Sequence, residues 1–250
     1  MFTPTSGFLL DTAARAMAAA LAKPSPEKVG SALDEVFAQA ELSWEATRTS
    51  TAFRLGMPAM ACKAGCGWCC HQQVGVSVPE AIRIAIHLRA LPGDEGEALA
   101  ERVRDADDKT NGLTTSQRSA AKLPCAFLVD GSCSIYGVRP LRCRGLISTD
   151  ESFCHASFSD PAAVKAGLEL GTLRPVFLGA PQHVHDQALN GVLKALHFAR
   201  LADYGLELHA AVRELLDQPK RMATWLKQRT APKTAALVPD PGADLRAQFR

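Results

Sequence analysis

The chain has 250 residues, with 28 lysines and arginines against 26 aspartates and glutamates, for a formal net charge of +2. This balance excludes the polybasic character of a typical nucleic-acid binder. No stretch approaches the roughly 18 apolar residues of a transmembrane helix, and no basic segment precedes the first apolar run. We therefore expect neither a membrane anchor nor a signal peptide, and predict a cytoplasmic protein.

The chain before residue 62 carries helical patterns. An alanine-rich stretch over 11–22 predicts a first helix, and Ser25 followed by proline predicts the start of a second helix that continues to about Thr47. Residues 48–61 contain glycine and proline and are expected to lead into the next region.

After the first cysteines, the alternation of Val74, Val76 and Val78 predicts a short extended segment. A capping box with an internal proline follows over 77–80 and predicts a helix that Pro92 and Gly93 terminate. A polar helix is predicted over 94–108 and a loop over 111–119.

A small hairpin is predicted over 125–136, because Asp130-Gly131 is a two-residue turn signal between short apolar runs. It would place Cys125 and Cys133 on opposite strands. Residues 139–144 follow as a loop.

The last third is again helical in pattern. Asp160 and Pro161 predict the start of a helix that Gly171 follows, and an apolar stripe over 189–199 predicts a longer helix. Further helices are predicted over 206–217 and 219–228.

We therefore expect a mostly α-helical protein whose helices clasp a small irregular cysteine-rich insert with a β-hairpin. The predicted divisions are N-terminal helices over 1–61, a metal-binding region over 62–155, C-terminal helices over 156–229 and a flexible tail over 230–250.

All cysteines of the chain lie between residues 62 and 154. They are Cys62, Cys66, Cys69, Cys70, Cys125, Cys133, Cys143 and Cys154. Disulfides suit short secreted chains, and adjacent cysteines cannot bond to each other without severe strain. A cluster of thiolates that holds iron or zinc is the interpretation we favour.

Cys66 and Cys69 form a C-x2-C pattern, in which Gly67 permits a tight turn whose amides can donate to the sulfurs. Neighbouring side chains diverge, so Cys69 and Cys70 are expected to serve two centres or two irons of one larger cluster. Eight thiolates match two four-sulfur sites. Cys62 and Cys70 would lean towards one site and Cys66 and Cys69 towards the other, while the division of the later cysteines stays open.

A metal centre with four thiolates leaves a net charge of about −2, which needs compensation when it is partly buried. Basic residues beside the cysteines are the candidates for this role. They are Lys63, Arg139, Arg142 and Arg144. The alternative for each is an ordinary surface base.

Histidines are weaker candidates. His71 and His155 each follow a cysteine and could replace one as a ligand, whereas the pair His183 and His185 is expected to be solvated at a helix start. Satisfied or exposed helical positions are expected for His87, His197 and His209. Trp68 is interpreted as a shield over the metal or a core aromatic, and Tyr136 as packing against the hairpin or as simple core.

The pattern from Cys62 to Cys70, the Pro124-Cys125 segment, and the stretch from Cys133 through Arg139-Pro140 to Cys143-Arg144 resemble the YkgJ-type cysteine-cluster family. That family is described as zinc- or iron-chelating, with a CxxCxxCC motif. Here three residues, where the family has two, separate Cys62 from Cys66. The family is similar to part of flagellin lysine N-methylases, which implies an iron–sulfur cluster, S-adenosylmethionine chemistry and a protein substrate.

Three functions stay open at this stage: a structural or electron-transferring metal protein, a protein-modifying enzyme, and a metal-handling or interaction module without catalysis. The resemblance favours iron–sulfur over zinc, while thiolates alone accept both. No phosphate-binding loop or serine nucleophile motif is present. Catalytic residues and the oligomeric state cannot be assigned from the sequence.

Overall fold

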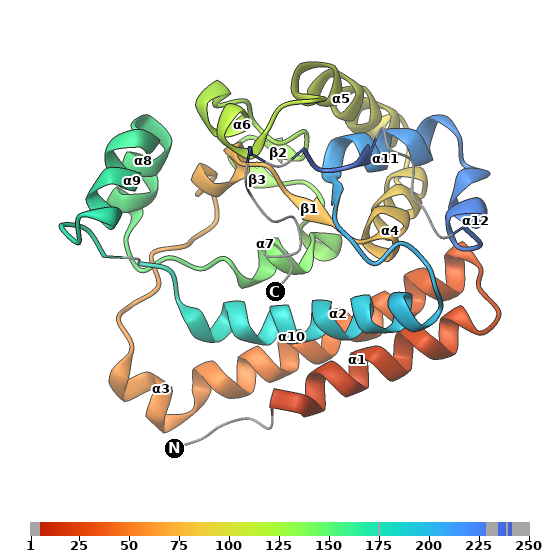
Figure 1. Ribbon diagram of the computed structural model, residues 1–250, viewed down its shortest axis with the longest axis horizontal. Coiled ribbons are helices and arrows are strands. Elements are labelled where there is room, and N and C mark those ends of the chain that lie inside the picture. The colour runs from red at the N-terminus through yellow and green to blue at the C-terminus, as the bar shows by residue number, and fades with distance from the viewer. Residues whose placement is uncertain (1–5, 175, 229–234, 239, 242–250) are drawn as a thin grey trace.

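The computed structural model describes residues 6–174, 176–228, 235–238 and 240–241. It confirms a mostly helical fold with small two-stranded sheets. Three long helices form the lower layer in Figure 1: α1 (Ser6–Leu21), α2 (Pro26–Thr49) and α10 (Gly179–Phe198). Helices α1 and α2 precede the cysteines and α10 follows them, so this layer joins segments far apart in sequence. Most of the remaining elements lie above it in Figure 1.

Small residues allow α1 and α10 to pack closely. A Cβ built on Gly191 would lie 2.4 Å from the Leu10 carbonyl oxygen and 2.7 Å from the Ala13 Cβ. Met17 of α1 and Val192 of α10 are fully buried. Glycine at position 191 is therefore what lets the two backbones meet.

The predicted caps hold the helices that begin after them. Ser25 accepts a hydrogen bond from the Lys28 N–H at the start of α2. The capping box predicted at Ser77 and Glu80 is present at the start of α4 (Val78–Arg89). Its carboxylate also accepts from the Leu141 N–H at 2.9 Å, so one buried glutamate ties α4 to the cysteine region.

The upper layer combines α4 with α5 (Glu95–Thr110), α11 (Leu208–Asp217) and α12 (Arg221–Trp225). Strand β1 (Gly75–Val76) pairs antiparallel with β4 (Leu206–Glu207), with Val76 opposite Leu206. The extended segment predicted near Val76 is confirmed. The helix predicted over 206–217 is wrong at its first two residues, because they pair with β1.

Three short helices lie where the sequence indicated no regular structure. They are α3 (Thr51–Gly56), α6 (Thr115–Ala121) and α7 (Leu141–Gly145). The loop predicted over 111–119 is therefore wrong in its second half, and the loop over 139–144 is wrong from Leu141. A capping box at Thr114 and Gln117 begins α6, and Pro140 precedes α7.

The predicted hairpin is confirmed as β2 (Leu128–Val129) and β3 (Ser132–Cys133), with Leu128 opposite Cys133. Asp130 and Gly131 both have positive φ, at 47° and 74°, as a two-residue turn requires. Cys133 lies on a strand, but Cys125 lies before β2, where its carbonyl accepts from the Leu128 N–H. The expectation of both cysteines on opposite strands is thus wrong for Cys125.

Helices α8 (Glu151–Ser159) and α9 (Pro161–Glu169) form a helical hairpin that stands apart on the left in Figure 1. The predicted start of α9 is confirmed, since Asp160 accepts from the Ala163 N–H. Both ends of this hairpin meet at a bridge between Ser148 and Phe177.

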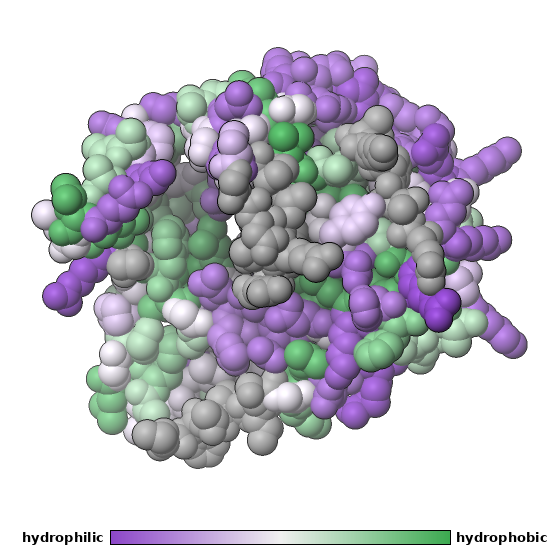
Figure 2. All heavy atoms as spheres, viewed as in Figure 1, coloured by the Kyte–Doolittle hydropathy of each residue, from purple (hydrophilic) through white to green (hydrophobic). Residues whose placement is uncertain are grey.

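Apolar side chains reach the surface at the left end of Figure 2, where α3, α8 and α9 lie. Leu55 and Leu170 are the most exposed of them. Polar side chains cover α5 at the upper right. In the described part of the chain, no helix combines the length and apolar character needed to cross a membrane.

Residues 230–250 were predicted to be a flexible tail, and only 235–238 and 240–241 of them are described. Ala235 and Leu237 are buried, and Ala236 bridges to Leu206. Asp240 accepts hydrogen bonds from the amide and hydroxyl of Ser116. These described residues pack against the upper layer, and the remainder of the predicted tail lies outside the described residues.

Candidate metal centre

The structure brings all eight thiols into one part of the molecule from separate segments. Cys62 and Cys66 lie on the loop after α3, and Cys69 and Cys70 on the short 3-10 helix η1 (Trp68–His71). Cys125 lies just before the hairpin, Cys133 on β3, Cys143 on α7 and Cys154 on α8. All eight are free thiols. The donor set is therefore purely sulfur, which suits zinc or iron.

Cys62, Cys66 and Cys154 form a first group, which we call the outer thiols. The Ser148 N–H donates to the Cys62 sulfur at 3.2 Å, and the Ser148 side chain hydrogen-bonds to the Cys154 thiol. The Cys154 sulfur interacts electrostatically with those of both Cys62 and Cys66. Ser148 thus lies between two thiols that are 92 positions apart in sequence.

Cys125, Cys133 and Cys143 form a second group, the inner thiols. The Cys143 sulfur interacts electrostatically with those of Cys125 and Cys133. Cys125 is buried, and it packs with Cys133 in the hydrophobic core. The inner thiols are therefore anchored by the fold, whereas Cys62 of the outer group is exposed.

Cys69 and Cys70 join the two groups. Their thiols hydrogen-bond to each other, so the side chains of these two neighbours on η1 diverge less than the sequence argument expected. Cys69 interacts with outer Cys154 and with inner Cys143. The Cys125 N–H donates to the Cys70 carbonyl at 2.6 Å, which fixes the inner group against η1.

Backbone amides donate to two more of the sulfurs, and the first of these bonds lies in the turn predicted around Gly67. The Trp68 N–H donates to Cys66 and the Ile135 N–H to Cys133. A Cβ on Gly67 would lie 3.0 Å from the Leu128 side chain, so glycine lets this turn approach the hairpin. These amides favour the thiolate form.

In the described residues, no three His, Cys, Asp or Glu side chains are arranged to hold one metal ion. The thiols interact within two groups but are not gathered around a point. Because a zinc–sulfur bond is about 2.3 Å long, a bound ion would draw the sulfurs inwards from these positions.

Burial raises the pKa of the Cys66, Cys133 and Cys154 thiols, and raises that of Cys143 well above its ordinary value. The pKa of Cys69 is raised first by its hydrogen bond to Cys70 and then by burial. Without a cation the cluster therefore favours protonated thiols. A metal ion that binds it must displace these protons.

The four bases predicted to compensate a metal centre differ in their surroundings. Arg139 lowers the pKa of Cys69 and Cys133, stacks 3.5 Å above the Tyr136 ring, and has a buried Nη1 without a hydrogen-bond partner. Lys63 lies near Cys66 but forms an ion pair with Glu151 at 2.9 Å.

The other two predicted bases face acidic residues of the lower layer. Arg144 pairs with Glu41 of α2 at 2.8 Å and stacks over Phe37. Arg142 lies 4.0 Å from Asp186 of α10. The compensating role predicted for all four thus finds direct geometric support only for Arg139 and, more weakly, for Lys63.

Two further basic residues beside the inner thiols were not predicted. Arg118 of α6 is buried, donates to the carbonyls of His71 and Leu123, and interacts electrostatically with Cys125. Its Nε and Nη2 have no hydrogen-bond partner. The sequence feature that could have pointed to the helix carrying Arg118 is the capping box that begins α6.

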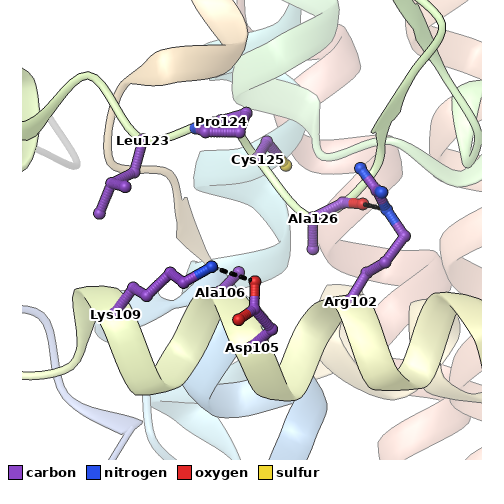
Figure 3. Close-up of a pocket in the computed structure, with 8 residues that line it drawn as sticks. All are labelled: Arg102, Asp105, Ala106, Lys109, Leu123, Pro124, Cys125 and Ala126. Carbon is purple, nitrogen blue, oxygen red and sulfur yellow. Dashed lines mark hydrogen bonds and ion pairs between the residues drawn. The ribbon is translucent and has the colours of Figure 1, made fainter.

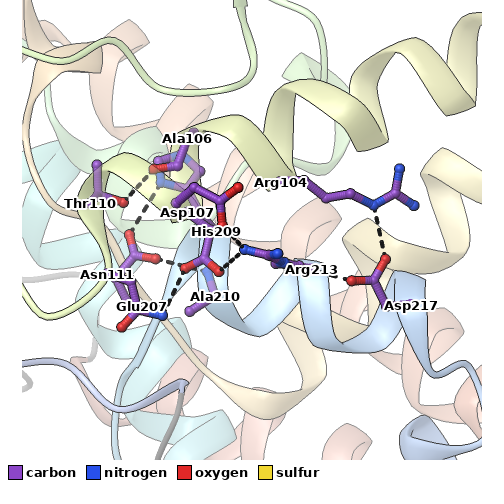
Figure 4. Close-up of polar contacts among 11 residues, drawn as sticks. Arg104, Ala106, Asp107, Thr110, Asn111, Glu207, His209, Ala210, Arg213 and Asp217 are labelled. Atoms are coloured by element: carbon purple, nitrogen blue, oxygen red, sulfur yellow. Dashed lines mark hydrogen bonds and ion pairs between the residues drawn. The ribbon is translucent and has the colours of Figure 1, made fainter.

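His209 is the second basic residue, and it reaches the inner thiols from α11. Burial alone would lower its pKa, but hydrogen bonds to Cys125 and Glu207 raise the pKa to about 10. Its Nδ1 lies 3.4 Å from a Glu207 oxygen (Figure 4). The Ala126 N–H donates to its Nε2 at 3.2 Å. His209 is buried in contact with a thiol, which the sequence interpretation of a satisfied or exposed helical position did not foresee.

The remaining predicted aromatic and histidine residues surround η1. Trp68 contacts His155 and Phe158 with ring centroids 4.8 and 5.4 Å apart, and His71 contacts Phe158 at 4.7 Å. Trp68, the first residue of η1, thus packs against α8. Tyr136 is mostly exposed and packs on Arg139, so simple core is excluded for it.

The histidine pair near the start of α10 is only partly as predicted. His185 is buried and its Nδ1 lies 2.8 Å from the Pro181 carbonyl oxygen, so the expected solvated position is wrong for it. His183 remains exposed. His185 also lies 3.8 Å from Glu41, which places it with Arg144.

A pocket borders the Cys125 segment on its α5 side (Figure 3). It encloses about 160 Å³ and is lined by Arg102, Asp105 and Lys109 across from Leu123 and Pro124. Arg102 donates to the Ala126 carbonyl at 2.9 Å, and Lys109 pairs with Asp105 at 2.6 Å. The charged side chains on this wall of the pocket therefore already have hydrogen-bond or ion-pair partners.

One of three comparisons with known proteins finds a match, and it covers the cysteine segment. No curated protein and no solved structure matches the chain. One family model matches residues 61–157, the segment that contains all eight cysteines; its description is "Putative zinc- or iron-chelating domain". Residues 61–157 of this chain are therefore similar to the CxxCxxCC family, and helices precede and follow this segment.

Proposed function

We propose that this protein binds iron as an iron–sulfur cluster through its clustered thiols, with zinc as the alternative metal. The observation that carries the proposal is the set of basic side chains around the inner thiols. Arg118, Arg139 and His209 come from three different segments and face Cys125, Cys133 or Cys69. Both arginines hold buried N–H groups that have no hydrogen-bond partner among the described residues.

These basic side chains have a physical purpose if the thiols are thiolates. A centre held by four thiolates carries a net charge of about −2, and burying it uncompensated would be costly. Neutral thiols would need no such counter-charges, and buried unpaired arginine N–H groups would then be a pure cost. The donor set and its surroundings therefore fit a thiolate-bound metal.

The residues that would hold the metal are the eight cysteines, and Arg118, Arg139 and His209 would neutralise the charge around it. Bound there, an iron–sulfur cluster supplies one-electron transfer, and zinc supplies a structural cross-link. Trp68 covers the η1 side and restricts water. Reduced thiols are required for this role, which favours the cytoplasm as the compartment.

A lysine-modifying activity with S-adenosylmethionine and a protein substrate rests on family resemblance alone. The described pocket beside Cys125 encloses about 160 Å³, below the roughly 300–1,000 Å³ of sites for drug-sized ligands. This geometry does not favour the enzyme interpretation over an electron-transferring or structural one.

Metal analysis of protein purified without oxygen or chelators tests the proposal. We expect a brown protein with bound iron and acid-labile sulfide, and Cys143→Ser should lose much of this content. Colourless protein with stoichiometric zinc would leave the structural alternative. Protein with neither metal would refute the proposal.

A further inference from the structure

We infer that the hairpin of α8 and α9 is a hinged cover, which turns as one body about a neck of residues 147–149 and 176–178 and carries Cys154 to and from the other thiols. This motion belongs to the folded chain with or without metal, and so goes beyond the proposed metal binding. Through it, one of the eight thiols leaves the site each time the hairpin opens.

The neck joins the hairpin to the body through two short antiparallel segments. Ser148 lies opposite Phe177, and backbone hydrogen bonds of 2.8 and 2.9 Å flank this pair. Helix α10 begins at Gly179, directly after the neck, and packs in the lower layer, so the body side of the neck is anchored (Figure 1). Hinges are a few residues at the ends of elements that absorb changes in φ and ψ, and the neck has this position.

Few side chains of the hairpin are buried. Helix α8 buries no residue, and α9 buries only Val164, which lies outside the main hydrophobic core of the described residues. Leu168 and Leu170 of the hairpin are exposed. Segments with so few buried apolar contacts open locally at a much smaller free-energy cost than the whole protein unfolds. The hairpin therefore opens while the helical layers stay folded.

The ring of Phe158 on α8 forms the latch of the closed hairpin. Its centroid lies 5.4 Å from that of Trp68 and 4.7 Å from that of His71, both on η1. The Lys122 Nζ lies 5.4 Å from the same centroid and donates to the Ser159 carbonyl at 2.7 Å. This carbonyl belongs to the C-terminal end of α8, where a cation is favoured.

Each contact of the latch is weak by itself. Aromatic pairs and partly exposed cation–π contacts contribute about 1 kcal/mol each, and exposed ion pairs contribute less. The pair of Lys63 with Glu151, which also links the hairpin to the body, is such an exposed pair. A latch made of a few contacts of this size holds the hairpin closed most of the time and still lets it open.

Opening separates thiols that are neighbours in the closed structure. Cys62 accepts a hydrogen bond from the Ser148 N–H at 3.2 Å, and the Ala61 N–H donates to the Ser148 carbonyl at 2.9 Å, so Cys62 is held beside the neck. Cys154 lies on α8 and moves with the hairpin. When the thiols bind metal as proposed, the closed hairpin supplies the eighth sulfur and the open hairpin withdraws it.

Hydrogen exchange of the full-length protein, resolved by region, tests the motion. We expect α8 and α9 to exchange together and faster than α10. Phe158→Ala should raise exchange in both helices by about tenfold and leave α10 unchanged, because it removes the ring contacts of the latch. Lys122→Met should act in the same direction from outside the hairpin. Phe198→Ala, at an exposed phenylalanine on α10, is the matched control and should leave the hairpin unchanged.

Alkylation of the reduced, chelated protein tests the effect on the thiol. Phe158→Ala should speed the alkylation of Cys154 by a similar factor but not that of Cys143, which lies on α7 in the body. Wild-type α8 and α9 that exchange as slowly as α10, or a rise confined to α8 in Phe158→Ala, would overturn the hinge. An unchanged alkylation rate of Cys154 would overturn its transport by the hairpin. Absence of iron and zinc would refute the proposed function, whereas exchange in α8 and α9 decides the motion in either case.

Discussion

The helical layer of α1, α2 and α10 and the cysteine region differ in what holds them together. In the layer, Met17, Leu33 and Val192 are fully inaccessible to solvent, and Gly191 lets two backbones touch. In the cysteine region the strands of the hairpin are two residues long and α8 buries nothing. We therefore expect apolar burial to account for the stability of the first, and a metal cross-link to add to the stability of the second.

The largest expected effect concerns the cross-link. Cys66→Ser and Cys69→Ser should release metal and destabilise residues 62–155 far more than α1, α2 and α10, because structural zinc binding contributes about 10 kcal/mol or more in small metal domains. Hydrogen exchange measured by region checks this. His87→Gln is the control and should keep the metal content. Unchanged exchange over 62–155 would show that the cysteines have no structural role.

The reverse perturbation acts on the helical layer. Gly191→Leu should destabilise the whole protein by about 3 kcal/mol or more, because its side chain would clash with backbone atoms of α1. Urea unfolding of metal-loaded and chelated protein should show the same loss in both. Ala188→Gly, also on α10 but without a clash, should cost about 1 kcal/mol. A loss seen only in chelated protein would contradict the separation of the two regions.

Arg139 and Arg144 lie five residues apart but belong to different regions. Arg144→Met should cost about 2–3 kcal/mol, because it removes a buried partner of Glu41 and of two backbone carbonyls, yet leave metal content unchanged. Arg139→Met should lower metal retention with a smaller loss of stability. Chelator competition and urea unfolding measure the two effects. Loss of metal from the Arg144→Met variant would instead support the prediction that Arg144 compensates the charge of a metal centre.

The smallest effect is a pH dependence. Burial lowers the pKa of His185 below its ordinary value of 6.5. The unfolded chain therefore takes up a proton below about pH 6.5 before the folded chain does, so this contribution to stability is present above that pH and is lost as pH falls. Unfolding of wild type and His185→Gln at pH 7.5 and 5.5 should show a smaller acid loss in the variant. Equal losses would contradict the lowered pKa.

The parts of the fold set by local chemistry were predictable from the sequence. Ser25, Ser77 and Asp160 cap helices where expected, and Asp130-Gly131 forms the predicted turn. The helix α6 was missed because its capping box at Thr114 is followed by only seven polar or small residues, which give no apolar periodicity. Strand β4 was missed because its partner, β1, lies about 130 residues earlier.

The thiols of the candidate site were predictable from the sequence, whereas the residues around them were not. The positions of the cysteines in the sequence identify the eight thiols, because no other residue type carries a thiol. The counter-charges Arg118 and His209 are 47 and 138 positions from His71 and only tertiary packing brings them to η1 and Cys125. Proximity to a cysteine in the sequence was misleading for Arg144, because in the fold its side chain pairs with Glu41.

The most direct test of the central claim is to count the thiols that metal protects. Protein purified anaerobically is treated with an alkylating reagent before and after chelation, and alkylated cysteines are counted by mass spectrometry alongside iron, zinc and sulfide per chain. The account predicts that all eight cysteines are protected while metal is bound and become reactive when it is removed. Folded protein that is isolated without metal under these conditions, and whose eight cysteines are already reactive before chelation, would contradict it.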